Sequence, residues 1–149
     1  EAYLIDVKKE QAKAKNGGTR ELPLFVGEKE GQTFYIVPIR GKGLWDAIWG
    51  YVALDKDMVV QGAFFDHAAE TPGLGAEIKY ASYSDQYTGE TIADTSGVFQ
   101  PIIVVKDGSG SGLNSKVDGI TGGTITSKGV EEMTTRTLGV YVNYFNTLN

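Results

Sequence analysis

The spacing of the apolar residues changes once along this chain, at Ser127, and this change constrains the fold more than any other feature. Before Ser127 the apolar residues form short runs rich in β-branched and aromatic types, which are typical of strands. After Ser127 they recur mostly at spacings of three to five, on one side of a long helix: Val130, Met133, Leu138, Tyr141, Tyr144 and Phe145. Strands first and one long helix last indicate the α+β class rather than alternating parallel units.

The strand-like runs are residues 22–26, 34–39, 50–54, 58–65 and 97–105. A short polar break, Asp55-Lys56-Asp57, separates two of them and predicts a hairpin, so the sheet is expected to be antiparallel. Residues 2–15 are charged and compatible with a helix that has only a weak apolar face. We therefore expect a single α+β domain, in which the C-terminal helix packs on an antiparallel sheet, preceded by an N-terminal arm or helix.

Composition narrows the classes of function. The 149 residues are 41% hydrophobic and 22% charged, which is ordinary for one globular domain. The formal net charge of −5, with no Lys/Arg cluster, argues against a general nucleic-acid binder, which needs a basic surface. The absence of cysteine excludes iron–sulfur clusters, thiolate zinc sites and disulfides within this chain. The longest apolar runs, such as residues 101–105, are too short to cross a bilayer.

A turn rich in glycine and threonine, residues 118–124, leads into the predicted helix. Thr126 or Ser127 is the expected N-cap, and Glu131 and Glu132 then lie in the first turn. Free backbone N–H groups and the positive end of the helix dipole favour a phosphate at such a position. The alternative is a turn that only caps the helix and binds no ligand.

The same segment resembles the D-G-x-(S/T)-G-A-T stretch of the FMN-binding domains of respiratory flavoproteins, in which FMN is attached through its phosphate to a threonine hydroxyl. On this resemblance Thr124 carries the FMN, and Asp118, Gly119 and Thr121 belong to the flavinylation motif. The neighbouring residues expected to bind the cofactor are Gly122, Gly123, Ile125, Thr126 and Ser127. Gly123 departs from the family, which usually has alanine there, but the difference removes no chemical group that the reaction needs.

Two further segments are similar to one branch of this family, the C subunit of the sodium-translocating NADH:quinone reductase. Residues 41–45 match its G-x-G-L-W signature, and residues 70–75 match E-T-P-G-L-G. The resemblance implies that the flavin ring lies against Leu44, Trp45, Glu70, Thr71, Gly73 and Leu74, with Lys106 near the ring. Taken singly, these residues also fit a core tryptophan, an ordinary Pro-Gly turn and a solvated lysine.

The resemblance implies an electron-transfer subunit that is not catalytic alone and relays electrons between the other subunits of a membrane-bound complex. It also implies that a separate flavin transferase attaches the FMN, using FAD and Mg²⁺. Residues 1–20 are then an arm that follows a membrane helix absent from this sequence, which begins at Glu1. Residues 21–149 are the FMN-binding domain, expected on the periplasmic side of the inner membrane.

Three other functions stay open. The related subunit of the ferredoxin:NAD oxidoreductase complex shares the threonine and the T-P-G-L-G element but resembles this chain less at residues 43–45. A non-redox extracytoplasmic binding module would use the glycine turn only as a cap. A flavoprotein that converts a small substrate needs acid and base groups, and the chain has one histidine and no cysteine. That histidine, His67, is expected in an exposed loop.

Overall fold

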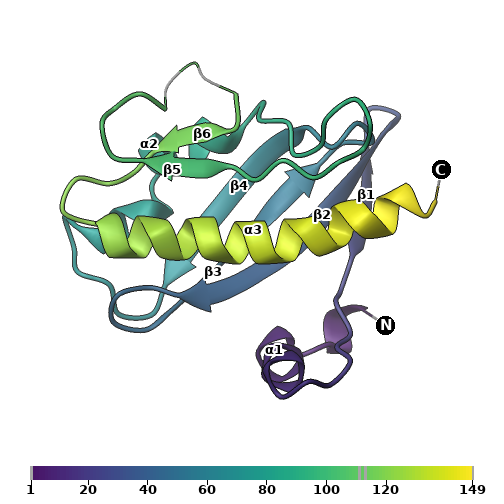
Figure 1. The fold of residues 1–149 in the computed structure, drawn as a ribbon, viewed down its shortest axis with the longest axis horizontal. Coiled ribbons are helices and arrows are strands. Elements are labelled where there is room, and N and C mark those ends of the chain that lie inside the picture. Colours follow the sequence, from purple (N-terminus) through teal and green to yellow (C-terminus); the bar gives the residue numbers. More distant parts are fainter. Residues whose placement is uncertain (1, 111, 113, 149) are drawn as a thin grey trace.

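Four consecutive strands pair in chain order, as expected where short polar turns separate apolar runs. They are β1 (Phe25–Lys29), β2 (Gln32–Lys42), β3 (Ala47–Leu54) and β4 (Val60–His67), and all three pairings are antiparallel. The computed structural model, shown in Figure 1, describes residues 2–110, 112 and 114–148. The predicted hairpin is confirmed, since Asp55 accepts from the N–H groups of Asp57 and Val59 between β3 and β4.

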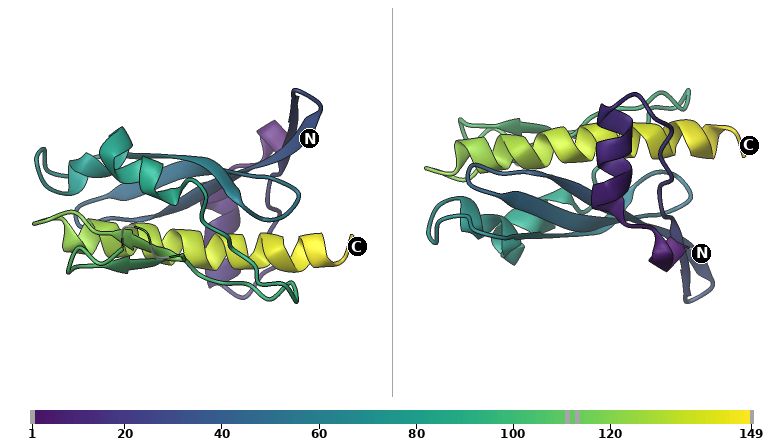
Figure 2. Two further views of the ribbon diagram at one scale, coloured as in Figure 1. Left: turned by 90° about the horizontal axis from the view of Figure 1, so that it is seen from above. Right: turned by 90° about the horizontal axis from the view of Figure 1, so that it is seen from below.

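Helix α3 (Thr124–Asn146) covers one face of this sheet, as predicted, and Figure 2 shows it running along the sheet in a separate layer. Its buried side chains include Val130, Met133 and Leu138, which pack in one core with Val37 and Ile48 of the sheet. Tyr144 does not belong to this stripe: its side chain is 49% exposed. The α+β class, with a C-terminal helix on an antiparallel sheet in a single domain, is confirmed.

A second, two-stranded sheet pairs β5 (Ile103–Val105) in parallel with β6 (Lys116–Asp118). The expected strand over residues 97–105 is therefore wrong for all but its last three residues, because Pro101 has no N–H to donate to a ladder. The expected strand over residues 22–26 is also displaced, since β1 begins only at Phe25. Leu22 and Leu24 instead pack against the edge of the core.

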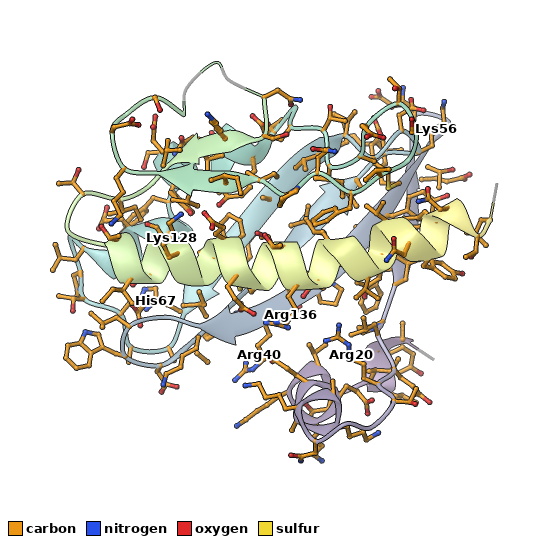
Figure 3. The ribbon with its side chains drawn as sticks, in the orientation of Figure 1. Arg20, Arg40, Lys56, His67, Lys128 and Arg136 are labelled. Atoms are coloured by element: carbon orange, nitrogen blue, oxygen red, sulfur yellow. The ribbon has the colours of Figure 1, made fainter. Side chains whose placement is uncertain are left out.

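The N-terminal segment contains a short 3₁₀ turn, η1 (Ala2–Leu4), and helix α1 (Val7–Lys15). Asp6 caps α1 by accepting from the N–H of Lys9, and the carboxylate of Glu10 accepts from the N–H of Glu21. Arg136 of α3 donates to the carbonyl oxygen of Arg40 at 2.8 Å, on the side of the sheet where α1 lies (Figure 3).

Three short helical segments follow β4: η2 (Gly75–Lys79), α2 (Ala81–Ser84) and η3 (Asp85–Tyr87). Tyr83 and Tyr87 from these segments pack their rings against Phe65 of β4 inside the core. Among the helices of the described residues, none has the length and apolarity needed to span a bilayer.

Candidate functional site

The glycine turn before α3 is held by backbone bonds from both sides. The N–H of Gly119 donates to the carbonyl of Val105 at 2.8 Å, and the N–H of Gly123 donates to the carbonyl of Ile120 at 2.9 Å. Gly122 has φ +75°, a conformation that glycine adopts without strain. An added Cβ there would lie 2.6 Å from Leu74, so the turn also lies against residues 70–75. This fixed turn delivers Thr124 as the first residue of α3.

The expected N-cap is wrong, because α3 begins three residues earlier than predicted. Gly123 occupies the cap position and makes no side-chain cap, while Thr126 and Ser127 lie inside the first turn and are buried. The Ser127 hydroxyl accepts from the N–H of Ile120 at 3.0 Å and donates to the carbonyl of Gly123 at 2.9 Å. Ser127 therefore stabilises the turn from within the helix. Glu131 and Glu132 consequently lie beyond the first turn.

The first three helical residues, Thr124, Ile125 and Thr126, precede the first intrahelical hydrogen bond, which Ser127 donates to Gly123 at 2.9 Å. Their N–H groups have no carbonyl four residues earlier in the helix to bond. Together with the helix dipole they attract negative charge to the position next to the Thr124 side chain. This geometry suits a phosphate group without any arginine.

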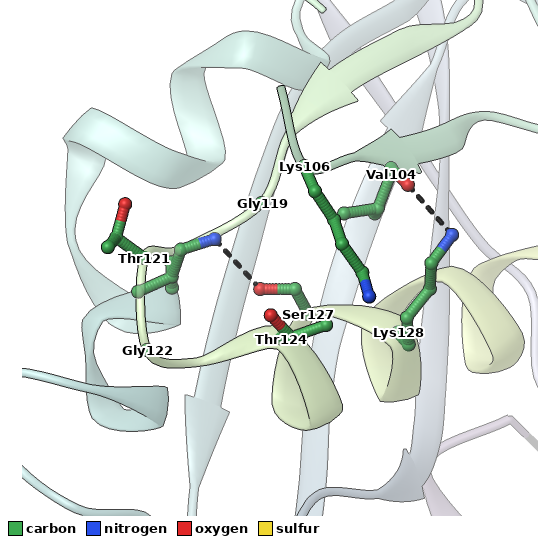
Figure 4. A pocket seen from close by; sticks show the side chains of 9 residues that line it. Val104, Lys106, Gly119, Thr121, Gly122, Thr124, Ser127 and Lys128 are labelled. Carbon is green, nitrogen blue, oxygen red and sulfur yellow. Dashed lines mark hydrogen bonds between the residues drawn. The ribbon is translucent and has the colours of Figure 1, made fainter. Parts of the chain in front are cut away.

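Two clefts meet at Gly122 and Thr124. The first, here called the lysine cleft, has a volume of about 190 Å³ and is lined by Val104, Lys106, Gly119, Ile120, Thr121, Gly122, Thr124, Ser127 and Lys128. In Figure 4 the Lys106 side chain points from the end of β5 toward Thr124 and Ser127. Lys128 instead donates to the carbonyl of Val104 and to Glu131, each at 2.7 Å. Within the described residues, the Lys106 ammonium has no such partner.

The second, here called the tryptophan cleft, has a volume of about 230 Å³ and lies on the other side of the turn. Its walls are Leu44, Trp45, Glu70, Thr71, Leu74, Gly75, Gly122, Gly123, Thr124, Ile125 and Thr126. Trp45 is 64% exposed, so it is not a core tryptophan, and its indole N–H donates to the Thr71 hydroxyl at 3.2 Å. The cleft thus joins both predicted ring-binding segments to the first turn of α3.

Glu70 lies at the base of the tryptophan cleft, only 4% exposed. Its carboxylate accepts from the N–H groups of Leu44, Trp45 and Asp46 at 3.1, 2.9 and 3.3 Å, and from the hydroxyl of Thr126. Burial acts to raise the pKa of Glu70, but the hydrogen bonds from the Thr126 hydroxyl and the backbone outweigh it and hold the pKa below its ordinary value. Both oxygens are therefore engaged within the protein.

His67 is the last residue of β4 and is half-buried, so its expected place in an exposed loop is wrong. Its Nδ1 accepts from the N–H of Glu70 at 3.1 Å, which assigns the ring proton to Nε2. That Nε2 is buried and has no hydrogen-bond partner in the part of the chain that the structure describes. His67 consequently orients Glu70 and faces no open cleft as an acid or base.

Two predicted residues line neither cleft. Gly73 is exposed with φ +75°, and its N–H donates to Glu77, so it shapes the 70–75 turn. Asp118 accepts from the N–H of Gly110 at 2.8 Å, and its own N–H donates to Gln86 at 2.7 Å. The structure therefore shows Asp118 ordering the approach to the turn.

Sequence reasoning missed four lining residues: Val104, Ile120, Lys128 and Gly75. Lys128 directly follows the segment of residues 118–127, and Gly75 is the last residue of the T-P-G-L-G element. The sequence patterns could therefore have indicated both residues. At Gly123, where the family usually has alanine, a Cβ would lie 3.0 Å from the Ile120 side chain and 3.2 Å from the Gly75 nitrogen. An alanine there requires these neighbours to move by a few tenths of an ångström.

The two clefts together offer the kinds of groups that bind a flavin. A tricyclic ring needs apolar or aromatic walls, a phosphate needs N–H donors, and the clefts offer both on either side of one threonine. Each cleft is smaller than the roughly 300–1,000 Å³ that encloses a small ligand. A flavin held in either cleft is therefore partly exposed.

Comparison with known proteins gives the same result. A sequence profile of the FMN-binding domain matches residues 43–139. The chain is 41% identical over 98 residues to the C subunit of the Na(+)-translocating NADH-quinone reductase of Vibrio anguillarum, a match covering 64% of this chain and 38% of that protein. It is 38% identical over 101 residues to the corresponding protein of Pseudomonas aeruginosa, a match covering 66% of this chain and 39% of that protein. The chain thus spans less than half the length of these relatives.

Among solved structures, the C subunit of the same reductase from Parabacteroides distasonis is 42% identical, with a TM-score of 0.84 over 97% of this chain and 70% of that one. Shewanella oneidensis NqrC is 28% identical, with a TM-score of 0.73 over 88% of this chain and 62% of that one. The fold described above is therefore shared with these two solved proteins. The chain therefore belongs to the FMN-binding domain family, in the branch formed by the C subunits of sodium-translocating NADH:quinone reductases.

Proposed function

We propose that this chain carries one FMN, joined by a phosphoester bond to the hydroxyl oxygen of Thr124, and passes electrons between other subunits of a sodium-translocating NADH:quinone reductase. The observation that supports this most is the place of Thr124. It is the first residue of α3, it is half-buried, and it lines both clefts. Among the threonines of the glycine turn, Thr121 lines only the lysine cleft.

We propose that a separate enzyme attaches the FMN, as the family implies. Among the described residues, the one carboxylate that lines the clefts, Glu70, already accepts hydrogen bonds from residues 44–46 and Thr126. The proposed reaction joins the Thr124 oxygen to the FMN phosphorus of FAD, releases AMP and transfers the hydroxyl proton to solvent or to the transferase. Thr124 is then the substrate of a Mg²⁺-dependent flavin transferase. The phosphodiester that results carries about one negative charge, which the N–H groups at the start of α3 stabilise.

Bound FMN supplies reversible uptake of electrons, and the chain supplies the surroundings. Trp45 and Leu74 offer apolar wall to the ring, and Thr71 orients the Trp45 indole. Lys106 offers a positive charge from the neighbouring cleft, which favours an anionic reduced ring. His67 is not placed for acid or base work on a further substrate, since it lines neither cleft and contacts Glu70 instead.

The proposed placement in the cell rests on the family resemblance. We propose that residues 1–20 lead from a membrane helix to the FMN-binding domain of residues 21–149, on the periplasmic side of the inner membrane. The partners are the other subunits of the same complex. In this proposal the flavin exchanges electrons with a partner protein that docks next to it, and no small substrate enters a pocket.

Co-expression with a flavin transferase tests the proposal. The parent protein is expected to gain the mass of one FMN minus one water, and the flavin is expected to survive denaturation. Thr124→Ala and Thr124→Val should both abolish the gain, whereas Thr121→Ala, the matched control in the same turn, should retain it. A flavinylated Thr124→Val protein would move the site elsewhere, and a parent without added mass would favour a non-redox binding module.

A further inference from the structure

The loop between β2 and β3, residues 43–46, forms one wall of the tryptophan cleft but has little backbone support of its own. A single turn bond, from the N–H of Gly43 to the carbonyl of Asp46 at 2.8 Å, closes it. The next three N–H groups, of Leu44, Trp45 and Asp46, all point at the carboxylate of Glu70. Successive N–H groups arranged in this way form a concave site for an anion, and here the anion is a side chain.

The second connection of Glu70 leads to the first turn of α3. The Thr126 hydroxyl donates to the Glu70 oxygen that also accepts from Leu44. Thr126 lies two residues after Thr124, on the same helical turn, and its side chain is buried. One carboxylate therefore connects the loop that bears Trp45 to the turn that bears the attachment threonine.

Two glycines leave room for this carboxylate and for the Thr126 hydroxyl. A Cβ on Gly43 would lie 2.6 Å from Glu70 Oε1, and a Cβ on Gly75 would lie 2.3 Å from Thr126 Oγ1. Both glycines thus admit the carboxylate and the hydroxyl at close range. Because Glu70 is only 4% exposed and the Thr126 side chain is buried, loss of the carboxylate charge would weaken the pairing of the Thr126 hydroxyl and of the three loop N–H groups.

We infer that Glu70 is a positioning residue: its buried carboxylate clamps residues 43–46 to the first turn of α3, and so fixes the width and the charge of the tryptophan cleft beside Thr124. The clamp is a property of the chain without flavin. Its effect on the flavin rests on the proposed function. Neither oxygen of Glu70 is available to bind the ring, so its part in flavin binding is indirect.

The charge of Glu70 has a consequence for the flavin. Uptake of electrons adds negative charge to the ring, and an ionised carboxylate in the cleft wall opposes that addition. The positive end of α3 and the Lys106 ammonium act in the opposite direction. Removing the Glu70 charge is therefore expected to make reduction easier and to shift the midpoint potential of the bound flavin to a more positive value.

Amide hydrogen exchange of the chain without flavin tests the clamp directly. In Glu70→Gln, the amide group offers one acceptor where the carboxylate offered two, so exchange at Leu44, Trp45 and Asp46 should accelerate about tenfold or more. Exchange at Val52, in the middle of β3, should stay as in the parent. Glu77→Gln is the matched control: it removes a carboxylate from the same segment that accepts only from Gly73, and it should leave residues 44–46 protected.

The flavinylated proteins provide the second measurement. The midpoint potential should be more positive in Glu70→Gln than in both the parent and Glu77→Gln. Unchanged exchange at residues 44–46 in Glu70→Gln, or an unchanged potential, would overturn the inference. If Glu70→Gln does not fold, Thr126→Val replaces it, because it cuts the link between Glu70 and α3. Faster exchange at Leu44, Trp45 and Asp46 relative to the parent supports the clamp, and parent-like exchange there overturns it. Failure of the parent to take up FMN would reject the proposed function but leave the exchange result valid.

Discussion

At the scale of single residues, Ser127 shows how the turn before Thr124 is stabilised. Its hydroxyl lies between two backbone groups of that turn, accepting from Ile120 and donating to Gly123. The side chain is fully buried, so water cannot replace these bonds. The turn that presents Thr124 therefore depends on a residue inside the helix, and the N-terminal cap itself contributes no side chain.

Ser127→Ala is expected to destabilise the protein by about 1–3 kcal/mol, because the N–H of Ile120 loses its partner in a buried place. Urea denaturation of the chain without flavin measures this loss. Thr121→Ala is the control, since Thr121 is exposed in the same turn and its replacement should change the free energy of unfolding by no more than about 0.5 kcal/mol. Equal stability of Ser127→Ala and the parent would show that the two bonds contribute nothing to the turn.

Thr124 and Gly122 were predicted from the resemblance of the glycine turn to a family motif, which is a local pattern, whereas the helix start beside them was predicted too late in the chain. The sequence did not reveal the role of Glu70, which depends on distant groups, or that of His67, which accepts from the N–H of Glu70 three residues later. Glu70 reaches residues 44–46, about 25 positions earlier, and Thr126, 56 positions later. Only the fold brings these donors together, so a segment match places Glu70 near the cofactor without saying what its carboxylate binds.

At the scale of elements, α3 and β2 approach each other at two glycines. A Cβ on Gly129 of α3 would lie 2.3 Å from the carbonyl oxygen of Lys42, and a Cβ on Gly41 of β2 would lie 2.7 Å from Met133. Both contacts lie where β2 ends beside the 43–46 loop. Close contact of helix and strand there sets the distance between the loop and the first turns of α3.

Gly129→Ala is expected to destabilise the protein by about 1–3 kcal/mol, although alanine has the higher helix propensity, because a backbone carbonyl has to move to admit the methyl group. Gly139→Ala is the matched control in the same helix. Its Cβ would lie 3.3 Å from the Phe99 ring, which is a side chain that can adjust. In thermal and urea unfolding, Gly129→Ala should be less stable than Gly139→Ala. The reverse order would mean that the Gly129 contact is not tight.

Helix α3 and the β3–β4 hairpin were predictable because their signals lie within about twenty consecutive residues. The parallel pair β5–β6 was not. Each strand has only three residues, and the partners lie about a dozen positions apart across a loop with several glycines. Parallel pairing between such short segments depends on the helix and on the bonds of Lys128 and Glu131 to Val104. No local pattern in residues 97–118 contains that information.

At the scale of the whole molecule, the carboxylates respond to folding in two opposite ways. Folding lowers the pKa of Glu10, mainly through the hydrogen bond from Lys13, and of Glu70, where the hydrogen bonds outweigh burial. Folding raises the pKa of Glu90, because its burial outweighs the hydrogen bond from the N–H of Ser115. A glutamate in the unfolded chain has a pKa of about 4.3. In the folded protein the pKa values of Glu10 and Glu70 therefore lie below this value, and that of Glu90 lies above it.

The sign of each effect follows from proton linkage. A lowered pKa gives stability that is present above about pH 4.3 and is lost as the pH falls through the lower, folded value. A raised pKa costs stability at neutral pH, and this cost disappears as the pH falls toward about 4.3. Glu90 therefore changes the stability between neutral pH and about pH 4.3, and Glu70 changes it below about pH 4.3.

The free energy of unfolding, measured with urea between about pH 7 and pH 2, is expected to fall mainly below about pH 4.3 in the parent. Glu70→Gln, already less stable at neutral pH, should fall less steeply in that lower range, because the proton that the parent takes up there is no longer bound. Glu90→Gln should keep the parent's fall below pH 4.3 but lose the opposing contribution above it. If the free energy of unfolding of Glu70→Gln ran parallel to that of the parent below about pH 4, folding would not stabilise the ionised form of the Glu70 carboxylate. The argument for a negative charge in the wall of the tryptophan cleft would then be wrong.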